Sequence, residues 1–244
     1  MPNGNPVAWV LSAFLALSSG CASARGSHPG PLASDAAVDA GAPAPAPLRS
    51  LESNAEGCGE AARAGDWAKA EAILGEANAN WSLLQPEVVT KGAAQETVKT
   101  IGDALIELAN DIQGKSSRAT QNASNVISTV VPDLFELYVF AVPAEALRLD
   151  AGFRQLQIDA DFSDWQACGA DVQLTSAIWK RLRPLAQSQA PNRADIGGSQ
   201  SVVADIDAAI AAAQSAIDAK AQAGAQDAAQ KGLDLVDTVE QIFQ

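Results

Sequence analysis

Carboxylates are the side chains of this 244-residue chain that are best suited to do chemistry. The chain has 29 acidic and 16 basic residues, and its formal net charge is −13. Its one histidine is His28 and its one methionine is Met1. Nucleophiles activated by histidine, histidine zinc sites and c-type haem attachment are therefore excluded downstream of His28. Catalysis would have to rest on two carboxylates. Because no spacing marks such a pair, we expect a protein that is not an enzyme and has no cofactor.

One acidic group has a spacing that could bind a hard cation. Asp159, Asp161 and Ser163 match the first three ligand positions of an EF-hand loop. That loop also needs a Gly at its sixth position and a Glu at its twelfth. This chain has Asp164 and Ala170 there. The match fails, and we expect no metal site.

The remaining charges indicate solvated helix surfaces. Asp234, Asp237 and Glu240 lie at three-residue steps and share one helix face. The basic cluster at residues 180–183 falls near a predicted helix end, where positive charge complements the helix dipole. The acidic balance would repel phosphate backbones, so we expect no binding to nucleic acid.

Four tryptophans offer a second kind of site, because aromatic pockets bind apolar or cationic molecules. They are Trp67, Trp81, Trp165 and Trp179. All four lie on apolar stripes of predicted helices, which favours core packing over a ligand box. A cleft between two helical halves would also be a candidate ligand site.

The tryptophans belong to a pattern that occurs twice. Trp67, Trp81 and Leu84 begin the first copy, and the same residue types recur at Trp165, Trp179 and Leu182, again with a proline two residues further on. Apolar residues at steps of three and four predict one buried face on each of these helices. Proline lacks an N–H and disfavours helix in the residue before it, so we expect Pro86 and Pro184 to end the two helices.

The duplication predicts an all-α fold of eight helices, in two four-helix repeats that pack together. The repeats cover residues 48–142 and 143–244. The stretch from Ala61 to Leu74 resembles one hairpin of the tetratricopeptide family, and this resemblance implies a helical superhelix as the alternative. Nothing recurs at the 34-residue period of such arrays.

The start of the chain indicates export. Residues 7–17 are apolar, too short to span a bilayer and typical of the core of a signal peptide. They lead into Ser18-Ser19-Gly20-Cys21, which resembles the lipobox of bacterial lipoproteins. The resemblance implies a signal peptide over residues 1–20 and lipidation of Cys21.

The same resemblance implies a place in the cell envelope. Because Ala22 follows the cysteine, the anchor would lie in the outer membrane, with the domain facing the periplasm or the cell surface. Cleavage after Ala24 is the alternative and would give a secreted or soluble periplasmic protein. Residues 21–47 are rich in Ala, Pro and Gly, and we expect a disordered tether there, followed by the helical domain at residues 48–244.

Cys58 and Cys168 fall on predicted buried stripes in different repeats. An oxidising compartment would permit a disulfide between them, which would join the two repeats. Alternatively, each is a small buried hydrophobic side chain. The sequence leaves both possibilities open.

These observations favour a non-enzymatic cell-envelope lipoprotein whose helical domain binds or scaffolds another component. The expected partner is an envelope protein or a small apolar ligand, and contact with the membrane is through the lipid anchor alone. The first alternative is a periplasmic carrier of a small ligand or cation, and the second is a hydrolase that uses carboxylates.

Overall fold

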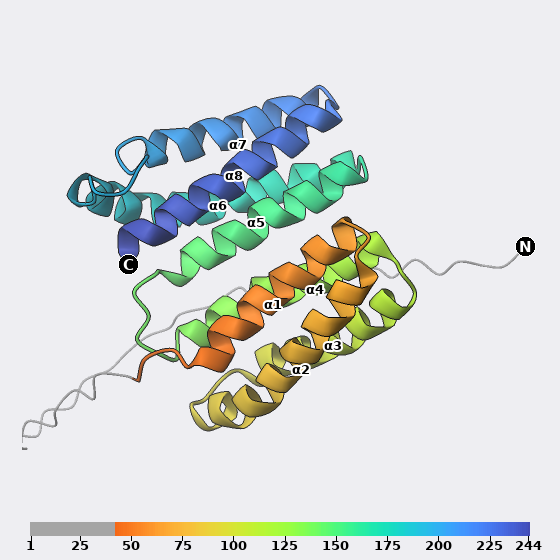
Figure 1. Cartoon of the computed structure of the whole chain (residues 1–244). Coiled ribbons are helices and arrows are strands. Elements are labelled where there is room, and N and C mark those ends of the chain that lie inside the picture. Colours follow the sequence, from red (N-terminus) through yellow and green to blue (C-terminus); the bar gives the residue numbers. More distant parts are fainter. Residues whose placement is uncertain (1–41) are drawn as a thin grey trace, which may run out of the picture. The chain divides into compact units, whose positions relative to one another are not determined.

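The computed structural model describes residues 42–244, which form the all-α fold that the sequence predicts (Figure 1). The first four helices are α1 (Ala46–Arg63), α2 (Trp67–Thr90), α3 (Gln95–Gln113) and α4 (Ser117–Phe135). The second four are α5 (Ala144–Asp161), α6 (Trp165–Gln189), α7 (Val202–Asp218) and α8 (Gln222–Phe243), with the 3-10 turn η1 (Ala190–Asn192) after α6. Extended pairing between residues 42 and 244 is limited to one bridge between Pro43 and Val139.

The signal peptide, Cys21 and most of the predicted tether lie outside the described residues. The folded part begins before the expected boundary at residue 48. Ala44 is already buried, α1 begins at Ala46, and the backbone N–H of Val139 donates to the carbonyl of Ala42 at 2.9 Å. Residues 42–47 therefore belong to the helical domain.

The duplicated Asp–Trp pattern produces the same helix start twice. Asp66 Oδ1 accepts a hydrogen bond from the backbone N–H of Lys69 at 3.1 Å, and this cap begins α2. Asp164 Oδ1 accepts from the N–H of Ala167 at 3.3 Å and begins α6. Each carboxylate satisfies a backbone donor that has no partner within its helix.

The prediction that Pro86 and Pro184 end their helices is wrong. α2 continues to Thr90 and α6 to Gln189. A proline removes one backbone hydrogen bond, and near the end of a long helix the flanking turns can tolerate that loss. In α2 the hydroxyl of Thr90 donates to the carbonyl of Pro86 at 2.8 Å and stabilises the last turn.

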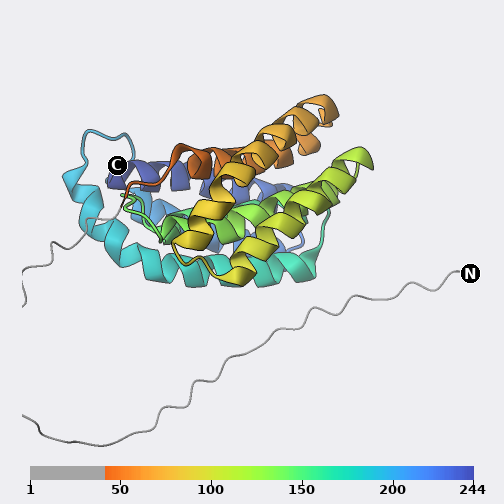
Figure 2. The same cartoon turned by 90° about the horizontal axis from the view of Figure 1, so that it is seen from below.

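Each repeat is a bundle with its own core. In the first, α1 and α3 each pack against both α2 and α4; in the second, α5 and α7 each pack against both α6 and α8 (Figures 1 and 2). Trp81 and Trp179 are buried in the two cores, and Leu84 and Leu182 are fully buried beside them. The first tryptophans of the pattern, Trp67 and Trp165, are partly exposed at the starts of α2 and α6.

The two cysteines lie in separate cores. Cys58 on α1 and Cys168 on α6 are both completely buried, and both are free thiols. No disulfide joins the repeats in this structure, which corresponds to the unbridged alternative. The Cys58 thiol donates weakly to the carbonyl of Ala70 at 3.6 Å, within its own repeat.

Contacts between the repeats join equivalent positions. Glu56 pairs with Arg154, and Arg63 pairs with Asp161; in each pair the two residues are 98 positions apart, which is the offset of the duplication. Both pairs lie between α1 and α5, which run in the same direction in Figure 1. Equivalent positions of the two repeats therefore meet between α1 and α5.

The helix contacts between the two repeats are not symmetric. α4 of the first repeat packs against α5 of the second. The equivalent partners on the other side are α8 and α1, and they make no comparable contact. The missing helix contact leaves a groove, and charged side chains from α1, α5 and α8 line it.

Candidate functional site

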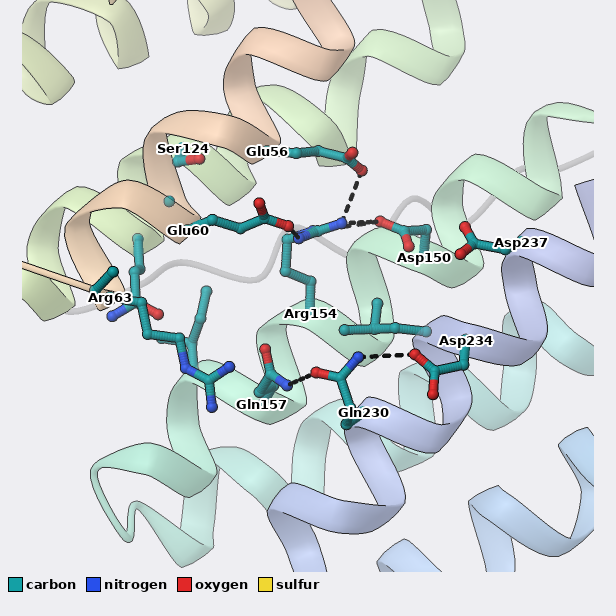
Figure 3. A pocket seen from close by; sticks show the side chains of 15 residues that line it. Glu56, Glu60, Arg63, Ser124, Asp150, Arg154, Gln157, Gln230, Asp234 and Asp237 are labelled. Carbon is teal, nitrogen blue, oxygen red and sulfur yellow. Dashed lines mark hydrogen bonds and ion pairs between the residues drawn. The ribbon is translucent and has the colours of Figure 1, made fainter. Parts of the chain in front are cut away.

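The groove where α1, α5 and α8 face one another has a volume of about 530 Å³ (Figure 3). Small-molecule sites commonly have volumes of about 300–1,000 Å³. Its charged lining comes from three helices: Glu56, Glu60 and Arg63 on α1, Asp150 and Arg154 on α5, and Asp234 and Asp237 on α8. In this lining, carboxyl groups clearly outnumber the cationic groups.

Arg154 lies at the centre of the groove and holds carboxyls of two helices together (Figure 3). Its Nη2 donates to Glu56 Oε1 at 2.8 Å and to Asp150 Oδ2 at 3.0 Å, and Nη1 lies 3.7 Å from Glu60 Oε1. Burial opposes the charge of Arg154, but Asp150 and Glu56 outweigh burial and raise its pKa. Arg154 is therefore a fixed cation between α1 and α5.

A second set of polar contacts fixes the other end of the groove. Arg63 Nε donates to Asp161 Oδ2 at 2.7 Å. Gln157 Nε2 donates to Gln230 Oε1 at 2.9 Å, and Gln230 Nε2 donates to Asp234 Oδ1 at 2.9 Å. This amide chain crosses from α5 to α8 and orients Asp234 at the rim (Figure 3).

The carboxyl of Glu56, on the α1 side, holds a proton at neutral pH. Burial, followed by the negative charges of Asp150 and Glu52, raises the pKa of Glu56 to about 10. Burial also raises the pKa of Glu52, one turn earlier on α1. A carboxyl with so high a pKa is neutral at pH 7, because its charged form is poorly solvated and has charged neighbours of the same sign.

α8 contributes a further carboxyl to this cluster. Burial, then the charges of Asp150 and Glu52, raises the pKa of Glu240 to about 8. Burial, then Asp150, also raises the pKa of Asp237. Asp234 and Asp237 are exposed, as the sequence indicates, whereas Glu240 is half-buried. The prediction of a solvated face is wrong for Glu240, since it interacts with the acids of α1 and α5.

Glu56 and Asp150 both accept from the same nitrogen of Arg154, so the guanidinium lies between these two acids. Within residues 42–244, no group of three or more His, Cys, Asp or Glu residues is placed to hold a metal ion.

The other residues singled out in the sequence lie away from the groove or in structural ion pairs. Trp81 and Trp179 are buried in their own cores. Asp159 accepts a hydrogen bond from Arg118 at 2.8 Å. In the basic cluster, Arg183 pairs with Asp207 at 3.0 Å, and the cluster lies before the last turn of α6, which extends to Gln189.

Comparisons with known proteins give no relative. No protein-family model matches the chain, and neither a curated protein nor a solved structure is significantly similar to it. None of the helices in residues 42–244 is both long and apolar enough to cross a membrane.

Proposed function

We propose that the protein binds a small organic cation, such as a polyamine, in the groove between α1, α5 and α8. The observation that carries this proposal is the excess of carboxyls in the groove lining, where five acids face the two cations Arg63 and Arg154. Glu56 and Glu240 have pKa values raised to about 10 and about 8, so protons compensate for the missing positive charge. A bound cation can replace those protons and interact with the carboxylates directly.

The spread of the acids favours an extended organic cation over a metal ion. Asp234 and Asp237 line the groove on α8, three residues and about 4.5 Å apart along the helix. Glu56 and Glu60 of α1 and Asp150 of α5 line the same groove of about 530 Å³. Amino groups spaced along a flexible chain can meet several such carboxylates in turn, whereas a metal ion needs its ligands around one point.

The groove supports the carrier alternative more strongly than a scaffold for another envelope protein. A scaffold needs a contiguous apolar surface. The large apolar side chains exposed within residues 42–244 are spread over several elements; they are Leu83, Val89, Ile106, Val126, Val139, Phe162, Leu174 and Leu185. Most of the groove's residues are polar or charged, which suits a charged ligand.

The proposal places this binding domain in the cell envelope. The apolar run at residues 7–17 and the motif ending at Cys21 support export and lipid anchoring, with release after Ala24 as the alternative. Both readings come from sequence outside the described residues. A carrier in either location would bind its ligand without changing it chemically.

Calorimetric titration of the full chain with spermidine tests the proposal. We expect saturable binding, and the variant Asp234→Asn/Asp237→Asn at the groove rim should weaken it about tenfold, which corresponds to about 1.4 kcal/mol. Asp205→Asn/Asp218→Asn on α7 removes the same charge away from the groove and serves as the control. No saturable binding, or an equal loss in both variants, would reject a specific site.

A further inference from the structure

A second groove lies between α2 and α3, and its equivalent in the other repeat lies between α6 and α7. The first has a volume of about 490 Å³ and the second about 460 Å³. Trp81 lines the first groove, and Trp179, at the equivalent position, lines the second. Comparison of the two copies shows which groups each groove has and which it lacks.

In the second repeat a carboxylate occupies the groove. Asp207 of α7 accepts a hydrogen bond from the indole N–H of Trp179 at 2.7 Å. The same carboxylate accepts two bonds from Arg183 of α6, at 3.1 Å from Nε and 3.0 Å from Nη2. Trp179, Arg183 and Asp207 therefore form one hydrogen-bonded set that spans the groove.

The first repeat keeps the tryptophan and lacks the carboxylate. Gly102 stands where the second repeat has Asp207, and Gln85 stands where it has Arg183. Gly102 has no side chain to accept the N–H of Trp81. A Cβ built on Gly102 would meet nothing within 4 Å, so the space of the missing carboxylate is open. Glycine inside a helix is unfavourable, and the fold's own packing does not require it here.

The first groove has branched apolar side chains at its surface that the second groove lacks. Val89 and Ile106 line it and are 55% and 64% exposed. The equivalent residues of the second repeat are Gln187 and Ala211. Val98 adds a third apolar side chain to the lining. Exposed branched side chains in a concave site favour an apolar ligand.

We propose that the groove between α2 and α3 binds a small carboxylate with a short aliphatic body. The ligand's carboxylate takes the place of Asp207 and accepts hydrogen bonds from Trp81 and Gln85, while its chain lies against Val89 and Val98. From Gln85 to Val89 is one helical turn of about 6 Å, which suits a chain of about six to eight carbons.

Lys99 can supply the positive charge for this carboxylate. It lines the groove on α3, one turn before Gly102. In the structure Lys99 forms an exposed pair with Asp103, which also lines the groove. Exposed pairs within one helix contribute little to stability, so Lys99 can turn to a ligand carboxylate at small cost.

Octanoate, 1-octanol and octylamine, which share one aliphatic chain, test the proposal. The readout is the indole N–H resonance of each tryptophan in ¹⁵N-labelled full chain, with Trp81 and Trp179 assigned through Trp81→Phe and Trp179→Phe. Octanoate should shift the Trp81 signal saturably and leave that of Trp179 unchanged. Octanol should bind about tenfold more weakly and octylamine more weakly still, because each loses the charge-assisted acceptor.

Exchanging residues between the repeats provides matched variants. Gln85→Arg/Gly102→Asp rebuilds the occupied arrangement in the first groove and should abolish binding, whereas Gly75→Asp, at another open helical glycine, should not affect it. The reverse exchange, Arg183→Gln/Asp207→Gly, should not create a second octanoate site, because the second repeat has Gln187, Ala204 and Ala211 at the positions of Val89, Lys99 and Ile106. The proposal is overturned if octanoate leaves Trp81 unshifted, if the filled groove still binds, or if octylamine binds equally well. These outcomes do not depend on the groove between α1, α5 and α8.

Discussion

Replacing Arg154 with methionine tests the role of the central cation. Methionine keeps an unbranched chain and removes the guanidinium that contacts Glu56 and Asp150 at 2.8 and 3.0 Å. The side chains of Arg154 and Asp150 are 14% and 12% exposed, so Asp150 would lose its counter-charge in a poorly solvated place.

The structure sets the size of the effect. Removing one partner of a buried ion pair costs about 3–5 kcal/mol. Glu56 already favours its neutral form, with a pKa of about 10, so losing its contact with Arg154 adds little to the destabilisation. We therefore expect the free energy of unfolding to fall by the lower end of this range, about 3 kcal/mol at pH 8. In a domain of this size the melting temperature should fall by roughly 6–12 °C.

The loss should depend on pH. Carboxyls left without Arg154 take up protons as the pH falls, which relieves the loss of the counter-charge. The free energy of unfolding that the variant loses relative to wild type should therefore be at least about 1 kcal/mol smaller at pH 5 than at pH 8. Urea denaturation at both pH values measures this. Arg183→Met removes an exposed pair, in which Arg183 and Asp207 are 44% and 43% exposed, and should cost less than about 1 kcal/mol at either pH. An Arg154→Met variant as stable as wild type, or equally destabilised at both pH values, would refute the reasoning.

The wild-type chain should become more stable as the pH falls from 8 to 6, because Glu56 and Glu240, with pKa values raised to about 10 and about 8, bind more protons folded than unfolded. Stability that is flat or rises with pH in this range, or a slope unchanged in Glu56→Gln/Glu240→Gln, would contradict that assignment. Gly232→Ala should lower the free energy of unfolding by about 1–3 kcal/mol, because its Cβ would lie 2.3 Å from the Phe153 ring. Gly75→Ala should raise the free energy of unfolding by about 0.5–1 kcal/mol, because the site is open and alanine favours helix. Urea denaturation that finds the same sign for both changes would contradict this. Cys58 and Cys168 should resist iodoacetamide in the folded chain and react after unfolding, because both are buried and burial raises their pKa values to about 12 and about 11. Peptide mapping measures the alkylation, and either cysteine alkylated in the native chain would show that its core opens.

Residue spacing predicts the helices well because each helix buries one stripe against its own repeat. The stripes of Trp81 and Leu84 and of Trp179 and Leu182 reach the same depth in the two cores. The prediction that Pro86 and Pro184 end their helices is wrong because the cost of a proline depends on how much helix follows it. Thr90, four residues after Pro86, closes the final turn, and proline rules for isolated dipeptides do not take this into account.

The groove could not be predicted because it arises from a helix contact that is absent. Nothing in the local sequence of α1 or α8 indicates that these helices stay apart while α4 and α5 pack together. One signal was present: an acidic and a basic residue type occupy equivalent positions of the duplication at Glu56 and Arg154, and again at Arg63 and Asp161. Complementary residue types at equivalent positions are what a contact between the two copies at those positions would require.

The most direct test of the account measures the protons that leave when a cation binds. Titration of the full chain with spermidine at pH 7.5, in buffers with different ionisation enthalpies, counts these protons. If the cation replaces the protons of Glu56 and Glu240, about one to two protons should be released per spermidine, and Glu56→Gln/Glu240→Gln should release almost none. Binding without proton release, or release that persists in the double variant, would contradict a cation site built from these carboxyls.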